Sequence, residues 1–116
     1  MTRRSSGAWG EDLALRYLTN RGYRLVERNY RTRHGEIDLI VRNEEALVFV
    51  EVKLRRGTAY GDPLEAVTRR KQTTLRKLAV EYLSDRDPRF GTLRFDVVGI
   101  LVGKDGVRVR HVEDAF

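Results

Sequence analysis

The 116-residue sequence predicts one α/β domain in which a mixed β-sheet is flanked by helices. Two observations predict this class. Apolar residues recur at helical spacing near the N-terminus and again in the second half of the chain, whereas the segments between and after them alternate with a period of two. Two pairs of strands are expected to form hairpins, separated by a helix, so a mixed sheet is the expected outcome.

The elements are expected in the order helix, three strands, helix, two strands. The first helix covers about Gly7–Thr19 and closes at Asn20-Arg21-Gly22. The second starts at Asp62-Pro63-Leu64-Glu65, where an Asp cap, a first-position Pro and a Glu form a capping box. It continues to about Leu83, and Asp85-Arg86-Asp87-Pro88 breaks it. The strands are expected over Tyr23–Asn29, Glu36–Arg42, Ala46–Leu54, Leu93–Val102 and Val107–Val112.

The composition favours a polyanionic partner and a reducing compartment. The net charge is +6, from 23 Lys and Arg against 17 Asp and Glu, which supports polyanion binding through counter-ion release. The absence of cysteine excludes disulfides and thiolate metal sites and suits the cytoplasm. No run of about 18 apolar residues predicts a membrane span. We therefore expect a single cytoplasmic domain over residues 1–116, with residues 1–6 as a flexible basic N-terminus that is not a secretion signal.

Charged residues interrupt the apolar pattern of the second and third strands. Alternation places Glu51 and Lys53 on the same face of the third strand as Phe49. It places Asp38 on the same face of the second strand as Ile40. A solvated sheet face would explain such charges, but Phe49 and Ile40 indicate partial burial. Burying a carboxylate is costly unless something neutralises it.

The hairpin register brings two carboxylates together. With a tight turn at residues 44–45, Asp38 lies directly opposite Glu51, and Glu36 lies opposite Lys53. The Asp and Glu should then repel across roughly 5 Å between Cβ atoms. Either one carboxyl keeps a proton through a raised pKa, or a cation binds between them. Mg²⁺ suits the second outcome because it prefers hard oxygen ligands, and Lys53 could orient a water beside a phosphate.

Glu11 adds a further carboxylate from the first helix. At about 100° per residue it falls within the apolar arc formed by Trp9, Leu13, Ala14, Leu15, Tyr17 and Leu18. A carboxylate in a buried stripe needs a partner, and proximity to the metal, directly or through a water, would supply one. Its place near the helix N-terminus, where the macrodipole favours an acid, is an equally good explanation.

The second helix carries a basic flank. Its core stripe, formed by Leu64, Val67, Leu75, Leu78, Ala79 and Tyr82, also contains Lys71. This lysine could extend to solvent, or it could reach a phosphate or a carboxylate near the site. A solvated helix face is the common explanation for the remaining charges. Together with the loop arginines, however, they favour a phosphate-backbone track formed by Arg55, Arg56, Arg69, Arg70, Lys71, Arg76 and Lys77.

Other polar residues are better explained by packing. Asp96 shares a strand face with Arg94, which predicts a structural ion pair. Tyr60 could stack on a base, but a lone loop tyrosine more often packs. His34 fits a turn, and His111 lies far along the chain from the carboxylates.

The segments Gly35-Glu36-Ile37-Asp38-Leu39-Ile40 and Val50-Glu51-Val52-Lys53 resemble the D…ExK signature of the PD-(D/E)xK nuclease superfamily. From Gly10-Glu11 to Arg94-Phe95-Asp96-Val97-Val98, about nine-tenths of the chain resembles the YraN family of small bacterial proteins. Ile37 stands where the signature has Pro. The resemblance implies a restriction-endonuclease-like αβββαββ core, similar to that of archaeal Holliday junction resolvases.

The same resemblance implies roles for individual residues. Asp38 and Glu51 would bind Mg²⁺ or Mn²⁺, with the Val52 carbonyl as a further ligand. Lys53 would position the attacking water. Glu11 corresponds to the acidic residue of the first helix that often completes such sites.

Two function classes follow. The leading one is a metal-dependent phosphodiesterase acting on DNA, including branched or single-stranded repair and recombination intermediates. The alternative is a non-catalytic nucleic-acid-binding or partner-docking module that retains the fold. A membrane-surface role has only the net charge in its favour, because no basic amphipathic helix with an exposed apolar face is present. Resolvase-like chemistry would require two sites and therefore a homodimer, for which the sequence identifies no interface.

Overall fold

The computed structural model describes residues 6–57 and 63–116. Residues 1–5 of the expected flexible N-terminus, the Asp62 cap and Tyr60 lie outside these ranges, while Ser6 begins the first helix. The described elements are α1 (Ser6–Asn20), β1 (Arg24–Thr32), β2 (Gly35–Arg42), β3 (Ala46–Arg56), the 3-10 helix η1 (Pro63–Ala66), α2 (Arg69–Arg86), β4 (Thr92–Gly103) and β5 (Gly106–Val112).

The predicted α/β class is confirmed. The described strands form one sheet in the order β1-β2-β3-β4-β5. Neighbouring strands pair antiparallel except β3 and β4, which run parallel on either side of the connection through α2. The two expected hairpins are β2–β3 and β4–β5, and the element order is αβββαββ apart from the short η1.

The start and end of the second helix differ from the expectation. The Asp-Pro-Leu-Glu signal leads only into η1, and α2 begins at Arg69. Thr68 is its N-cap, with an extended backbone and a side-chain oxygen that accepts the Lys71 N–H at 3.1 Å. The helix continues past Leu83 to Arg86, and Asp87 closes it in the left-handed conformation. Val67, which lies between the expected and the observed start, is buried in the apolar cluster with α2.

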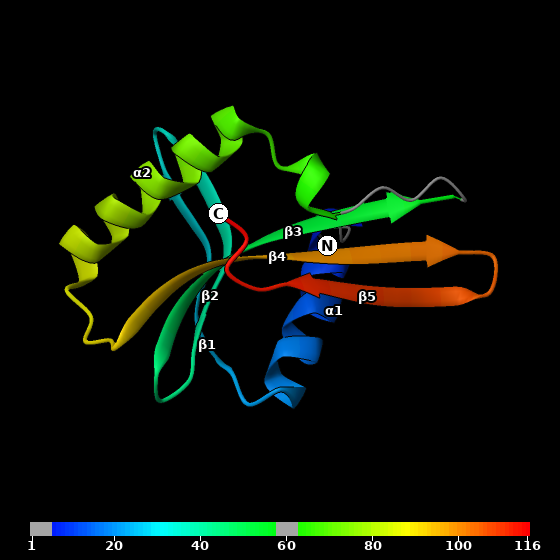
Figure 1. The fold of residues 1–116 in the computed structure, drawn as a ribbon, viewed down its shortest axis with the longest axis horizontal. Coiled ribbons are helices and arrows are strands. Elements are labelled where there is room, and N and C mark those ends of the chain that lie inside the picture. The colour runs from blue at the N-terminus through cyan, green and yellow to red at the C-terminus, as the bar shows by residue number, and fades with distance from the viewer. Residues whose placement is uncertain (1–5, 58–62) are drawn as a thin grey trace, which may run out of the picture.

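The sheet separates two apolar layers, and Figure 1 shows α1 and α2 on opposite sides of it. The α1 layer contains the predicted helix arc, together with Leu39, Val48 and Val50. The α2 layer contains most of the predicted second stripe, together with Ile40 and Phe49. Leu64 of that stripe lies in η1, and its side chain is outside the described part. Over the described residues, no helix is long and apolar enough to cross a bilayer.

Side-chain alternation slips where β1 and β2 pass the predicted site. Strict alternation would put Ile37 and Leu39 on one face, yet Ile37 packs in the α2 layer and Leu39 in the α1 layer. Alternation is lost in the same way in the neighbouring strand, β1. Arg28 hydrogen-bonds to α1, whereas Tyr30 packs against α2 and hydrogen-bonds to it. Asn29, between them, has a positive φ of 55°. The slip leaves Asp38 at the boundary between the two layers.

Candidate metal centre

A cleft of about 280 Å³ lies where β2 and β3 separate beside the first half of α1. It brings together all of the residues predicted from the sequence to hold or assist a metal. Its lining comprises Gly7, Gly10, Glu11, Asp38, Glu51, Val52, Lys53 and Leu54. These residues come from three elements, so the cleft exists only in the folded chain.

The predicted β2–β3 register is confirmed over the length of the ladder. The last pair is Leu39 with Val50, and one further step in that register places Asp38 opposite Glu51. Here the ladder ends, because Oδ2 of Asp38 accepts the Val52 N–H at 2.8 Å. The expected pairing of Glu36 with Lys53 is therefore wrong. Diverging strands leave Glu36 to bond with β1 instead, where its carboxylate accepts from Arg31 at 2.6 Å.

The Asp38–Glu51 pair is electrostatically strained. Burial, followed by a hydrogen bond and charge repulsion from Glu51, raises the pKa of Asp38 well above its ordinary value. The Glu51 side chain is 4% exposed, and its Oε2 has no hydrogen-bond partner among residues 6–57 and 63–116. Lys71 Nζ lies 3.3 Å from that oxygen, an ion-pair distance. The raised pKa of Asp38 agrees with the first predicted outcome, proton retention. Lys71 is a cation of the protein itself, and a metal ion between the two acids stays a prediction.

Glu11 is held by β1. Its Oε1 accepts from Arg28 Nε and from Asn29 Nδ2, each at 3.1 Å. The helix-terminus explanation for Glu11 is wrong, because α1 begins at Ser6 and its first turn holds no acid. The Arg28 guanidinium, which also bonds Asp12 and the Ala8 carbonyl, supplies the charge partner instead.

Sequence reasoning missed Arg28, Asn29 and Glu36 as part of this site. Asn29 bridges Glu11 and Glu36, with a 2.7 Å bond to Glu36 Oε1. Carboxylate oxygens of Glu11, Glu36 and Asp38 consequently lie within 4.8 Å of one another. The only signal in the sequence was Asn29 itself, since Asn tolerates the left-handed conformation better than most residues.

The donor set fits a hard divalent cation. Asp38, Glu51 and Glu11 all line one cleft, and oxygens of Glu11 and Asp38 also belong to the cluster with Glu36. Mg²⁺ and Mn²⁺ prefer oxygen ligands. The buried Glu51 Oε2 offers a ligand atom whose hydrogen-bonding capacity is unused within the described residues. Val52 lines the same cleft beside Lys53.

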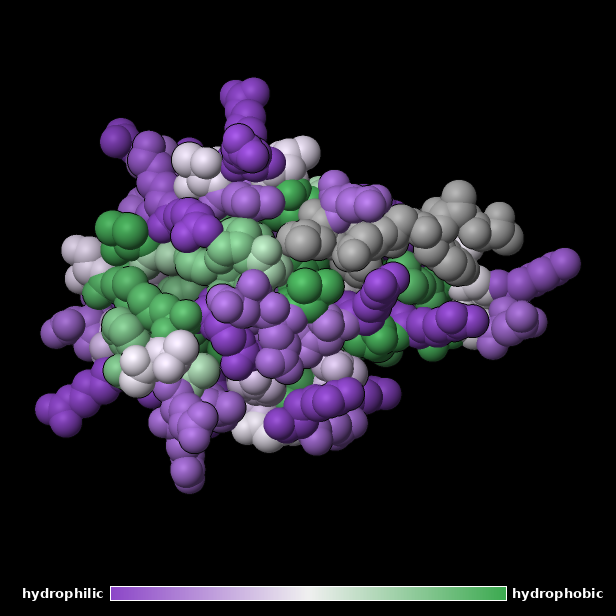
Figure 2. All heavy atoms as spheres, in the orientation of Figure 1, coloured by the Kyte–Doolittle hydropathy of each residue, from purple (hydrophilic) through white to green (hydrophobic). Residues whose placement is uncertain are grey.

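The predicted basic residues divide into three groups. Lys71 reaches the site itself through Glu51. Arg55 and Arg56 are exposed at the end of β3, and Arg56 lies 5.8 Å from the Trp9 ring centroid. The remaining residues lie exposed along α2, where Figure 2 shows hydrophilic side chains projecting; they are Arg69, Arg70, Arg76 and Lys77. Arg76 also lies over the rings of Phe95 and Phe116, so it contributes to packing.

Asp96 forms a structural network, as predicted. Its carboxylate is fully buried and bonds Arg94 at 2.8 and 3.0 Å. His111, which the sequence gave no reason to place here, contributes Nε2 at 2.7 Å. Burial would raise the pKa of Asp96, but bonds from His111, Arg94 and the Asp114 N–H together hold it below its ordinary value. His34, at the β1–β2 turn, pairs with Glu81 of α2 at 2.6 Å.

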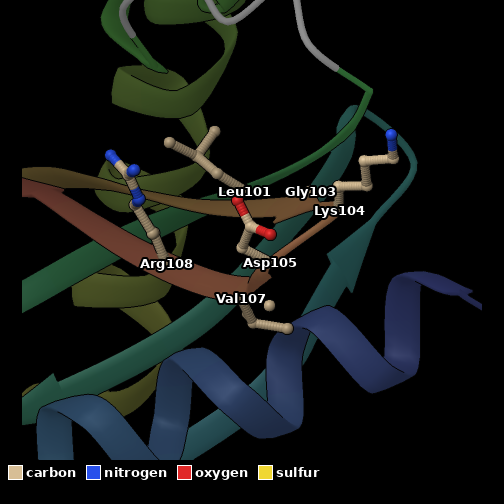
Figure 3. Close-up of a pocket in the computed structure, with 7 residues that line it drawn as sticks. Leu101, Gly103, Lys104, Asp105, Val107 and Arg108 are labelled. Carbon is tan, nitrogen blue, oxygen red and sulfur yellow. The ribbon is translucent and has the colours of Figure 1, made fainter.

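A second cavity, of about 360 Å³, lies at the tip of the β4–β5 hairpin (Figure 3). Its charged lining residues are Lys104, Asp105 and Arg108, all exposed. A single acid beside two basic residues offers no carboxylate pair for a cation. Of these two cavities, the cleft between α1, β2 and β3 is the one lined by several carboxylates.

Comparison with known proteins places the chain among close relatives. The model of the family described as "Uncharacterised protein family UPF0102" matches residues 10–100. A UPF0102 protein of Rhodococcus jostii is 54% identical over 111 residues, covering 95% of this chain and 94% of the relative. A UPF0102 protein of Syntrophomonas wolfei is 47% identical over 113 residues, covering 97% and 98% of the two chains. The matched region contains the whole cleft except Gly7.

Proposed function

We propose that this chain, which belongs to the UPF0102 family, is a Mg²⁺- or Mn²⁺-dependent nuclease of the PD-(D/E)xK superfamily that hydrolyses phosphodiester bonds in DNA. The observation that carries the proposal is the buried Asp38–Glu51 pair in a cleft that also contains Glu11 and Lys53. Folding brings these acids together at an energetic cost, which a bound divalent cation would offset.

Each charged residue of the cleft has its own role in the proposed reaction. Asp38 and Glu51 would hold the cation, with the Val52 carbonyl as a further ligand and Glu11 acting directly or through a water. When bound, the cation supplies Lewis-acid stabilisation of the phosphate and a water of lowered pKa. Lys53, which lines the same cleft, would orient that water or donate to a phosphate oxygen. Asn29, whose side-chain amide donates to both Glu36 and Glu11, would keep Glu11 in place.

The substrate is inferred from charge. Arg69 and Arg70 are exposed and directly precede Lys71, whose ammonium lies at Glu51, and we propose that these cations form a border beside the cleft. Such a border would align a phosphate backbone without reading sequence. We further propose that the substrates include branched or single-stranded repair intermediates. The protein would act in the cytoplasm and would form a homodimer for paired cleavage.

One observation favours the alternative of a non-catalytic nucleic-acid-binding or docking module. Lys71 and Arg28 already pair with Glu51 and Glu11, so internal cations balance part of the acidic charge. In that case the carboxylates would have a structural role. Calorimetric titration of Mg²⁺ or Mn²⁺ into the wild type and Asp38→Asn separates the two: binding by the wild type alone supports the nuclease, and binding by neither supports the module.

Activity itself is tested by incubating branched, single-stranded and duplex DNA with Mg²⁺ or Mn²⁺. We expect cleavage by the wild type and by Lys104→Ala, which alters an exposed hairpin residue outside the cleft. Lys53→Ala should reduce the rate by about 100-fold or more. Equal trace activity in the wild type and Lys53→Ala would show that the assignment is wrong.

A further inference from the structure

Glu51 and Lys71 form an ion pair that connects the proposed metal centre to the start of α2. Glu51 is 4% exposed, whereas the Lys71 side chain is 39% exposed, so the acid is fixed inside and its partner lies at the protein surface. The 3.3 Å contact is accompanied by no hydrogen bond to Glu51 Oε2 from any described residue. The ammonium therefore provides charge at this oxygen without a directed bond.

The two ends of Lys71 are held differently. Its backbone N–H is anchored by the Thr68 cap, in the first turn of an 18-residue helix. Its ammonium is joined to that anchor by a flexible four-carbon stem with solvent on one side. The head group can thus leave Glu51 without any movement of the helix.

A divalent cation bound by Glu51 would take the place of the Lys71 ammonium as the positive charge beside this carboxylate. Two cations cannot share one buried oxygen without strong repulsion, and the lysine is the one with an exit to solvent. Once released, its ammonium would lie beside the exposed Arg69 and Arg70, where the proposed function places the phosphate backbone.

We infer that Lys71 is the resident counter-ion of Glu51, that a divalent cation displaces it, and that the displaced ammonium then binds a substrate phosphate. This inference rests on the proposed function, because it requires a metal at Glu51. It imposes an order on binding: Lys71 contributes to nucleic-acid affinity only after the metal has bound.

The first test is calorimetric titration of Mn²⁺ into the wild type, Lys71→Met and Lys104→Met. Met keeps the length of the stem and removes the competing charge. We expect Lys71→Met to bind Mn²⁺ roughly tenfold more tightly than the wild type, and Lys104→Met to match the wild type. Equal or weaker binding by Lys71→Met overturns the inference while leaving the metal site intact.

The second test uses fluorescence anisotropy of a labelled duplex oligonucleotide, with EDTA or with Ca²⁺ as a divalent ion that binds oxygen ligands. Lys71→Met should match the wild type in EDTA and bind several-fold more weakly in Ca²⁺. An equal loss under both conditions would mean that Lys71 contacts phosphate regardless of metal, which contradicts displacement.

The outcomes separate this inference from the proposed function. If neither the wild type nor Lys71→Met binds Mn²⁺, the metal centre and the displacement are both wrong. If only Lys71→Met binds, the lysine is confirmed as the competitor. A double-mutant cycle of Lys71→Met with Glu51→Gln in metal-free buffer checks that the pair interacts in solution, since zero coupling in unfolding free energy overturns the counter-ion role.

Discussion

The backbone N–H of Val52 donates to Oδ2 of Asp38 at 2.8 Å, immediately beyond the last ladder pair of β2 and β3. A side-chain acceptor has replaced the backbone acceptor that a continuing ladder would use. The two strands can therefore separate without leaving a buried N–H unpaired. In the opening between them, Asp38 meets Glu51 and faces α1, so the end of the ladder creates the site.

The stability of the metal-free protein should depend on Asp38. Burial, then the hydrogen bond and charge of Glu51, raises the pKa of Asp38 to about 9. Because this folded pKa exceeds the unfolded value, the folded state retains a proton that the unfolded chain loses, and stability falls as pH rises from about 4 towards 9. Asp38→Asn cannot titrate, so we expect it to be more stable than the wild type by about 1–3 kcal/mol at pH 8 and by little at pH 4.

Urea unfolding in EDTA at the two pH values measures this difference. Asp105→Asn, at the exposed hairpin tip, is the control and should differ little from the wild type at either pH. A stability gain for Asp38→Asn that is the same at pH 4 and pH 8 would contradict the raised pKa.

Metal binding should release a proton. Below pH 9 the raised pKa of Asp38 leaves its carboxyl largely protonated, and a cation needs the ionised form. Apparent Mn²⁺ affinity should thus rise between pH 6 and pH 8, by up to about tenfold per pH unit. Calorimetry in two buffers of different ionisation enthalpy reports the protons released, and a buffer-independent heat at pH 7 would count against this linkage.

The Asp96 network should stabilise the fold at neutral pH. Although burial opposes its ionisation, bonds from His111, Arg94 and the Asp114 N–H lower the pKa of Asp96. A depressed carboxyl pKa contributes stability above the unfolded pKa, and that contribution is lost as pH falls through the folded value. His111→Ala removes one bond to a fully buried carboxylate and should cost about 2–4 kcal/mol at pH 7.

Unfolding free energies at pH 7 and pH 3 check this prediction. The cost of His111→Ala should be smaller at pH 3 than at pH 7, because the contribution of the ionised Asp96 is lost as pH falls through its folded pKa. Substitution of the exposed neighbour, Arg110→Ala, should have little effect at either pH. A His111→Ala cost that does not diminish in acid would argue that packing against Tyr17 accounts for the effect.

The observed start of α2 can be tested at its cap. Thr68→Ala removes the oxygen that accepts the Lys71 N–H, and we expect a loss of about 1 kcal/mol in unfolding free energy. Thr73→Ala, an exposed interior position of the same helix, is the matched control and should cost less. Equal effects of the two substitutions would indicate that the helix does not depend on Thr68.

The salt dependence of DNA binding should depend on the basic border formed by Arg69 and Arg70. The double substitution Arg69→Ala/Arg70→Ala removes two proposed phosphate contacts, which should reduce the slope of log affinity against log salt by about 1–2. Arg108→Ala/Arg110→Ala on β5 removes the same charge away from α2 and serves as control. Filter binding over a salt series measures both, and identical slopes would imply that net charge alone drives association.

Much of the architecture was predictable because its causes are local. Alternating apolar residues located the strands, and the two-residue turn at residues 44–45 set the register that brings Asp38 opposite Glu51. Phe49 and Ile40, which alternation assigned to the same face as the acids and which are buried, made the acids conspicuous in the sequence. The family follows from the same motifs, and its model covers residues 10–100.

What the sequence determined by itself is therefore the order of elements, the hairpin register and the acidic pair. Only the tertiary structure decided which cations accompany those acids: Arg28 lies 17 residues from Glu11, and Lys71 reaches Glu51 from another layer. It also decided that α2 starts at Arg69, capped by Thr68, and that alternation slips at Asn29. Periodicity records which face a residue prefers, whereas pairing across layers depends on how the strands twist and separate, and no local pattern carries that information.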